Sequence, residues 1–171
     1  MKSKTAEWFE TTVKYDKMGE EGVPVSVKEP YTVEANSFTE TEETIAEELS
    51  PYISGEFDVV DIKKAAYREV FFSESAADDR WFKTKIAFII IDEKTGKEKR
   101  SAVTYLVQAN NLQNAVKNIE DVMDKGMQDW KLASVAETTL MDVFEHNAAA
   151  KAEEKNDVPE YEQAEQPVEN I

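Results

Sequence analysis

Two stretches of the chain alternate between apolar and polar residues, which is the pattern of a strand with one buried face. In the later stretch the core-facing positions are Phe82, Thr84, Ile86, Phe88 and Ile90, and the opposite face begins with Trp81, Lys83 and Lys85. In the earlier stretch the core-facing positions are Phe9, Thr11, Val13 and Tyr15, opposite Trp8, Glu10, Thr12 and Lys14. A turn with glycine follows each stretch, at 19–22 and 92–96, and a second apolar strand follows the turn, at 31–35 and 102–109. The pattern predicts two β-hairpins.

A helix is expected after each hairpin. The later one carries apolar residues at i, i+3, i+4 and i+7, namely Leu112, Ala115, Val116, Ile119, Val122 and Met123. In the earlier one Ser37 and Glu40 form a capping box, and the thinner apolar stripe consists of Phe38, Ile45 and Leu49. A long final strand then closes each unit, at 57–72 and 130–144. Its length predicts a bulge or bend near Lys64-Ala65 and near Glu137-Thr138.

The two halves match each other in order. Residues 8–72 align with residues 81–145, and the matched positions are Trp8-Phe9 with Trp81-Phe82, Tyr31-x-Val33-x-Ala35 with Tyr105-x-Val107-x-Ala109, Ile45 with Ile119, and Val70-Phe71 with Val143-Phe144. We therefore predict an α+β fold of two tandem ββαβ repeats, residues 1–77 and 78–146, which together form one compact domain with antiparallel sheets and two helices. Because one such unit buries too little surface alone, the copies are expected to pack with pseudo-two-fold symmetry, either edge to edge or face to face.

The net charge of −16 is distributed unevenly. Residues 147–171 hold seven acids against Lys151 and Lys155, which leaves residues 1–146 at −11. The acidic tail has few apolar residues, so we predict that 147–171 is disordered. The acidic body argues against a binder of duplex DNA, which needs a broad positive face, and against an anionic membrane surface as partner. It leaves open a narrow groove for a single strand.

Composition also excludes several kinds of chemistry. The chain has no cysteine, which excludes disulfides, zinc–thiolate sites and cysteine nucleophiles. His146 is the only histidine, and its place at the end of the folded region predicts a solvated surface residue. We predict a non-enzymatic protein with no catalytic residues, no metal site and no cofactor. The N-terminus lacks an apolar stretch, and no apolar run could cross a bilayer, so we expect a cytoplasmic protein without a signal peptide.

One strand face suggests a binding site. Tryptophan and basic residues alternate along it in the later unit, at Arg80, Trp81, Lys83 and Lys85, and Trp8 and Lys14 occupy the matching face of the earlier unit. Single-strand binders use this combination, because rings stack on bases while cations contact phosphates. The structural alternative is equally simple: a Trp at the start of a strand covers the edge of a core, and lysines keep an outer face soluble.

Two other kinds of partner stay open. The helix from Glu40 to Glu48 and the acidic tail offer negative surfaces to a basic protein, which would make the chain a protein-interaction or regulatory module. A homodimer joined through an exposed edge strand is the third alternative.

Several phrases of the sequence resemble a known family. They are Glu29-Pro30-Tyr31-Thr32-Val33-Glu34-Ala35, Ser37-Phe38-Thr39-Glu40, the segment 49–57 from Leu49-Ser50-Pro51 to Glu56-Phe57, and the segment 136–144 from Ala136-Glu137-Thr138 to Val143-Phe144. They are similar to an uncharacterised domain family (a domain of unknown function) of gut Bacteroidetes and their bacteriophages, over residues 7–146. The resemblance implies a bacterial or phage-infected cytoplasm and no catalytic residue. The tail resembles, in composition alone, the acidic C-termini of single-stranded DNA-binding proteins.

Overall fold

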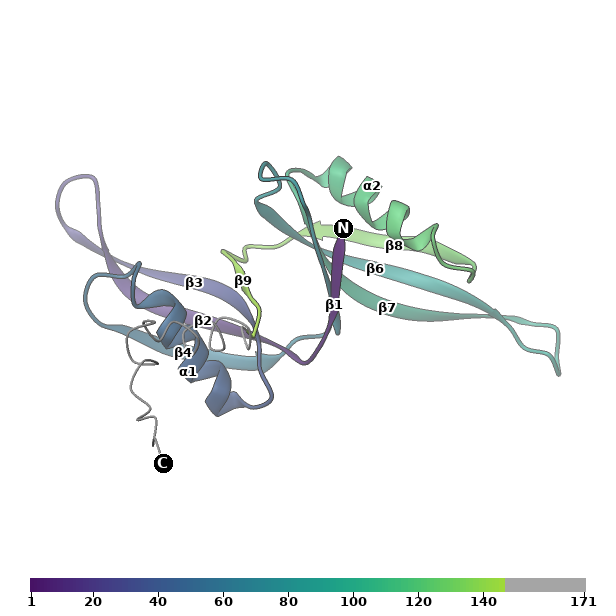
Figure 1. Cartoon of the computed structure of the whole chain (residues 1–171), viewed down its shortest axis with the longest axis horizontal. Helices are drawn as coiled ribbons and strands as arrows, with labels where there is room; N and C mark the ends of the chain where they lie inside the picture. The colour runs from purple at the N-terminus through teal and green to yellow at the C-terminus, as the bar shows by residue number, and fades with distance from the viewer. Residues whose placement is uncertain (147–171) are drawn as a thin grey trace, which may run out of the picture.

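The chain folds into two sheets, each with one helix, in a computed structural model that describes residues 1–146 (Figure 1). The four-stranded sheet has the order β4 (Phe57–Lys64), β2 (Trp8–Met18), β3 (Pro24–Glu34) and β9 (Val143–Phe144). The five-stranded sheet has the order β1 (Lys2–Thr5), β5 (Glu69–Phe72), β7 (Glu98–Ala109), β6 (Arg80–Ile91) and β8 (Trp130–Glu137). The predicted tail lies outside the described residues.

The two predicted hairpins are confirmed as β2–β3 and β6–β7. The first pairs Trp8 with Glu34 at its base, and the second pairs Arg80 with Ala109. Gly22 and Gly96 lie in the turns at φ +74° and +66°, a region that a residue with a side chain rarely adopts. The tips of the hairpins project at opposite ends of the long axis of the molecule (Figure 1).

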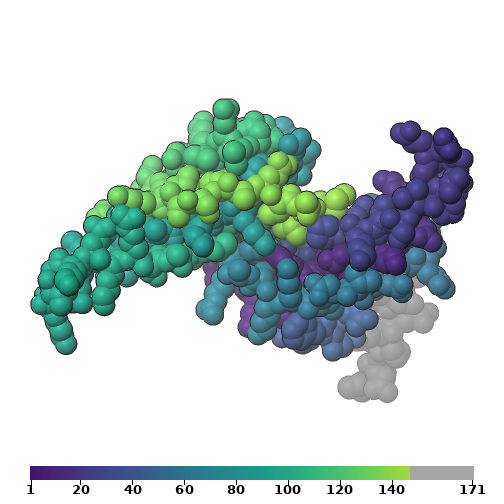
Figure 2. Space-filling view, turned by 180° about the vertical axis from the view of Figure 1, so that it is seen from behind, coloured from purple at the N-terminus to yellow at the C-terminus, as the bar shows by residue number. Residues whose placement is uncertain are grey.

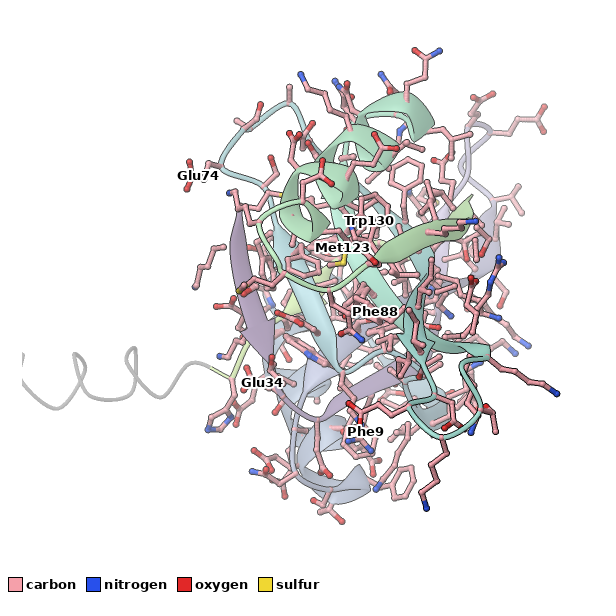
Figure 3. All side chains as sticks on the ribbon, turned by 90° about the vertical axis from the view of Figure 1, so that its right-hand side faces the viewer. Phe9, Glu34, Glu74, Phe88, Met123 and Trp130 are labelled. Atoms are coloured by element: carbon pink, nitrogen blue, oxygen red, sulfur yellow. The ribbon has the colours of Figure 1, made fainter. Side chains whose placement is uncertain are left out.

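Helix α1 (Phe38–Leu49) begins where the capping signal predicts, and α2 (Leu112–Met123) begins at the first residue of its predicted apolar pattern. The Glu40 backbone N–H donates to Ser37 Oγ at 3.1 Å, as in a capping box. The Glu40 carboxylate accepts the backbone N–H of Asn36 at 2.9 Å, one residue before the N-cap. Each helix buries its apolar stripe against one face of its sheet, and Ile45 and Ile119 are fully buried there. Phe88, Met123 and Trp130 fill the space between α2 and the five-stranded sheet (Figure 3).

The long final strand expected in each unit is instead two strands. The chain leaves β4 after Lys64 and leaves β8 after Glu137, at the predicted bends. It then crosses to the other sheet, where β5 pairs in parallel with β7, and β9 pairs in parallel with β3. Both sheets are therefore mixed, and the expectation of purely antiparallel sheets is wrong. The cause is the exchange of strands between the sheets. In the sheet that it joins, the second half of each expected strand lies next to a strand that runs in the same direction.

Strand β1 was not predicted from the sequence; it pairs antiparallel with β5 at the edge of the five-stranded sheet. Its four residues alternate charge and hydroxyl without an apolar position. This segment is a strand because its backbone pairs with β5, and not because of its own residue pattern. Each sheet consequently takes strands from both 1–77 and 78–146.

The two sheets meet through their helix-free faces. A core between them is made of residues from both, namely Trp8, Tyr67, Val70, Trp81, Leu106 and Val143. Tyr67 lies on the crossing from β4 to β5, and Leu140, on the crossing from β8 to β9, packs against the same core. The sheets overlap only near the bases of the hairpins, and the two hairpin arms point away on either side (Figure 2).

Candidate functional site

Trp8 and Trp81, the two rings of the predicted stacking face, are buried. Each is only 3% exposed, and both belong to the core between the sheets. The Phe72 ring lies 6.4 Å from the Trp8 ring and 5.5 Å from the Trp81 ring, edge-on to the latter. The expectation that these rings lie on an open face is therefore wrong. The physical reason is that the second sheet covers the face that the alternating pattern left without a helix.

Lys83 is held by a carboxylate of the other sheet. Its Nζ lies 2.7 Å from Glu10 Oε1 and 5.7 Å from the centre of the Tyr67 ring. Lys63 approaches Glu10 Oε2 at 3.5 Å from β4. Burial raises the pKa of the Glu10 carboxyl, but the hydrogen bond and charge of Lys83, helped by Lys63, outweigh it and lower that pKa. Lys83 thus joins the two sheets and is not free for a phosphate.

A buried pair of hydroxyls lies beside this ion pair. Thr32 is fully buried on β3, and its hydroxyl forms a hydrogen bond with the hydroxyl of Tyr67. Burial raises the pKa of the Tyr67 phenol far above its usual value, so the ring stays neutral. Glu10, Lys83, Tyr67 and Thr32 therefore form a polar contact inside the interface between the sheets, and its role is structural.

The structure separates the other three predicted residues. Arg80 Nη1 lies 3.4 Å from Glu137 Oε1, and both side chains are exposed. Lys14 lies on β2 of the other sheet, between Lys28 on β3 and Asp58 on β4. Lys85 lies on an exposed part of the five-stranded sheet and forms no ion pair with another residue of 1–146. The six predicted residues do not form one site.

Lys85 belongs to a surface that we call the open face. It is the helix-free side of the β8–β6–β7 arm beyond the overlap of the sheets, and its residues are Lys85, Ala87, Ala102, Thr104, Lys131 and Ser134. Lys85 lies opposite Thr104 and Ser134, and Ala87 lies opposite Ala102 and Lys131. Neither lysine forms an ion pair with another residue of the described range. Toward the tip of the arm the same side continues with Arg100 and Glu98, which pair with each other at 3.3 Å.

A groove continues from the open face along the edge of β7. Its volume is about 390 Å³, and its walls include Ala102 and Thr104 on one side and Ala66 and Arg68 on the other. Arg68 is exposed and has no ion-pair partner within residues 1–146. Lys131, Lys85 and Arg68 are therefore three cations along one continuous surface, and Glu69, which also lines the groove, is an acid next to Arg68.

A family model for a domain of unknown function, DUF4494, matches residues 7–146. The chain belongs to the DUF4494 family. The resemblance to an uncharacterised domain family over this range is thereby confirmed. The DUF4494 match includes both helices and every strand except β1, and it ends at His146. No curated protein and no solved structure matches the chain.

Two cations of this DUF4494 chain were missed by sequence analysis. Lys131 lies between Trp130 and Leu132, which face α2, so the alternation of β8 already indicated that it points to the other side. Arg68 carried no such signal, because its position depends on where the chain crosses between sheets.

The described part of the DUF4494 domain offers no metal site and no membrane-spanning helix, and its histidine lies at the surface. His146 is exposed, as predicted, and its Nδ1 lies 3.3 Å from Glu40 Oε1 at the start of α1. Within residues 1–146, no three His, Asp or Glu side chains gather closely enough to hold a metal ion. Neither helix in that range has the length and apolar character needed to span a membrane.

Proposed function

We propose that this protein is a non-enzymatic binding protein whose ligand is single-stranded nucleic acid, held on the open face. The observation that supports it best is the pair of lysines, Lys85 and Lys131, that has no carboxylate partner in the described part of an otherwise acidic body. A flat strip of Ala, Ser and Thr separates them, and small side chains let a phosphate backbone approach the sheet closely.

The proposed mode of binding differs from ring stacking. With Trp8 and Trp81 buried, affinity comes from contacts of phosphates with Lys85, Lys131 and Arg68, and the hydroxyls of Thr104 and Ser134 add hydrogen-bond donors. Such binding tolerates any base sequence. Three phosphate contacts to a single strand predict a slope of about −2 when log K is plotted against log salt concentration.

We also propose that the two halves of the domain are copies of one unit. We treat residues 1–77 and 78–146 as tandem copies of one ββαβ unit related by pseudo-two-fold symmetry. The recurring element order, the register shifts after Thr12 and after Lys85, and the mutual exchange of β5 and β9 support this. The resemblance to proteins of gut Bacteroidetes and their phages supports a bacterial or phage-infected cytoplasm as the setting.

Binding of a labelled oligothymidylate to the full-length chain tests the proposal. We expect binding at low salt that weakens as salt rises, measured by fluorescence anisotropy. Lys85→Glu/Lys131→Glu should lower the affinity roughly ten-fold or more, because two attractive contacts become repulsive. The matched control is Lys14→Glu/Lys28→Glu, which reverses two facing lysines on the corresponding side of the four-stranded sheet.

Two outcomes would contradict the proposal. One is the absence of binding at low salt. The other is an equal loss in both double variants, which would indicate a response to net charge rather than a site. Duplex DNA of the same length should bind no better than the single strand, because three cations on a narrow arm cannot follow both backbones.

A second candidate function rests on α1. Its outer face presents Glu42, Glu43 and Glu47, and the exposed rings of Phe38 and Tyr52 lie at its two ends. Exposed aromatic residues beside charges are typical of protein interfaces. A basic protein partner whose binding is lost in Glu43→Lys/Glu47→Lys and also in Tyr52→Ala, with oligonucleotide binding unchanged, would favour this candidate.

A further inference from the structure

The tips of the two hairpins carry exposed apolar side chains. Tip one is residues 16–25 of the β2–β3 hairpin, and its exposed apolar residues are Met18, Val23 and Val25. Tip two is residues 90–100 of the β6–β7 hairpin, where Ile90 and Ile91 are exposed. Met18 is 69% exposed and Ile91 is 67% exposed. Because consecutive strand residues point to opposite faces, Ile90 and Ile91 lie on the two sides of tip two, and Met18 and Val25 lie on the two sides of tip one. Each side of each tip therefore exposes apolar surface beside charged side chains, which is the composition of a contact surface.

The two tips carry opposite charge. Tip one has Asp16, Glu20 and Glu21 against Lys17, a net charge of −2. Tip two has four cations against three acids, a net charge of +1. In tip two, Lys99 and Arg100 pair with acids of the same hairpin, at 3.5 Å and 3.3 Å. Lys94 and Lys97 at the turn of tip two have no ion-pair partner within residues 1–146, nor do Glu20 and Glu21 at the turn of tip one.

Both tips are held in one shape by their own backbone. In tip one the Gly19 N–H donates to the Val23 carbonyl at 2.9 Å, and the Gly22 N–H donates to the Gly19 carbonyl at 3.1 Å. In tip two the Asp92 N–H donates to the Lys97 carbonyl at 2.9 Å, and the Asp92 carboxylate accepts the Lys94 N–H. A preformed surface loses less conformational entropy when it binds.

We propose that tip one of one molecule docks on tip two of a second copy of this chain, head to tail. Apolar residues of one tip cover those of the other, while Glu20 and Glu21 face Lys94 and Lys97. The charge pattern favours this pairing over tip one on tip one, which would bring like charges together. The inference is independent of the proposed function.

The geometry of the contact determines the assembly. The tips lie at opposite ends of the molecule, so each contact leaves one free tip of each kind (Figures 1 and 2). A contact between two different surfaces extends into an open chain or closes into a ring. We therefore expect oligomers of increasing size as the protein concentration rises, and not a closed two-fold dimer.

The test uses two full-length variants, each with one defective tip. Val23→Asp disables tip one, and Ile91→Asp disables tip two. Sedimentation velocity across a range of concentrations should show growing oligomers for the natural chain and monomers for each variant alone. An equimolar mixture of the two variants should form a species of two chains and nothing larger, because one intact tip of each kind remains. The control is Val60→Asp, which places the same charge on an exposed valine outside both tips.

Charge reversal provides a second, independent readout. Glu20→Lys/Glu21→Lys should abolish the oligomers, and adding Lys94→Glu/Lys97→Glu in the same chain should restore them. A natural chain that stays monomeric at high concentration and low salt would overturn the proposal. So would a mixture of the single variants that stays monomeric, or a single variant that still dimerises alone. Thermal unfolding should show that each variant keeps the stability of the natural chain, because these side chains lie outside the cores.

Discussion

Trp81→Ala is expected to lower the free energy of unfolding by about 3–5 kcal/mol, the usual cost of removing a large buried aromatic side chain. Trp81 is 3% exposed and packs edge-on with Phe72 in the core between the sheets. The residues around it come from both sheets, so the cavity cannot collapse without shifting one sheet against the other. Urea unfolding followed by circular dichroism measures the loss, from the shift in midpoint at constant slope.

The matched control is Tyr52→Ala, which removes an aromatic ring that is 81% exposed. It should change stability by no more than about 0.5 kcal/mol. Trp81→Phe should fall between the two, because it keeps most of the buried apolar surface. A Trp81→Ala chain of unchanged stability that had lost oligonucleotide binding would instead restore the interpretation of Trp81 as a stacking ring.

The local elements of this fold could be predicted from the sequence, because their signals are local. Alternation identified β2 and β6, the i, i+3, i+4 pattern identified α2, and Ser37 with Glu40 located the start of α1. These features depend on neighbouring residues and on backbone geometry, which the sequence states directly.

The sequence pattern did not show what packs against the helix-free face of each sheet. Alternation separates two faces but does not say what covers the second one. One signal was present: Trp8-Phe9 and Trp81-Phe82 place large apolar residues on both faces at the base of each hairpin, which is typical of a strand buried on both sides. Read in this way, Trp8 and Trp81 belong to a core, and only the distal lysine, Lys85, is left for a ligand.

The exchange of β5 and β9 had no local signal. Both strands are short, and each pairs with a strand far away in the sequence, at Tyr105 for Glu69 and at Thr32 for Val143. A short apolar segment has the same pattern whether it continues its own sheet or joins another. Only the packing of Tyr67 and Leu140 into the core between the sheets determines where the chain crosses.

Lys83→Met is expected to destabilise the protein by about 1–3 kcal/mol at neutral pH, because it leaves a largely buried carboxylate with a weaker partner. The Glu10 side chain is 12% exposed, and Lys63 at 3.5 Å would remain its only cationic partner among residues 1–146. The Lys83 side chain is partly exposed itself, which places the loss below that of a fully buried pair. Lys85→Met is the matched control: it lies two residues along the same face of β6, makes no ion pair with a described residue, and should change stability little.

The pH dependence identifies the ion pair as the cause. The pKa of Glu10 is lowered in the folded chain, with burial opposing and Lys83 and Lys63 prevailing. A carboxyl with a lowered folded pKa stabilises the protein above its unfolded pKa, and this contribution is lost as the pH falls through the folded pKa. The difference in unfolding free energy between the natural chain and Lys83→Met should therefore be largest near neutral pH and shrink below about pH 4.

A double-mutant cycle completes the test. Glu10→Gln removes the charge that Lys83 pairs with, so Lys83→Met should cost much less in a Glu10→Gln chain than in the natural one. The cost of Lys85→Met should be the same in both backgrounds. If Lys83→Met is equally destabilising at every pH and in both backgrounds, its methylenes rather than its charge stabilise the contact between the sheets. In that case the contact with the Tyr67 ring, and not the ion pair with Glu10, is what fixes Lys83 between the sheets.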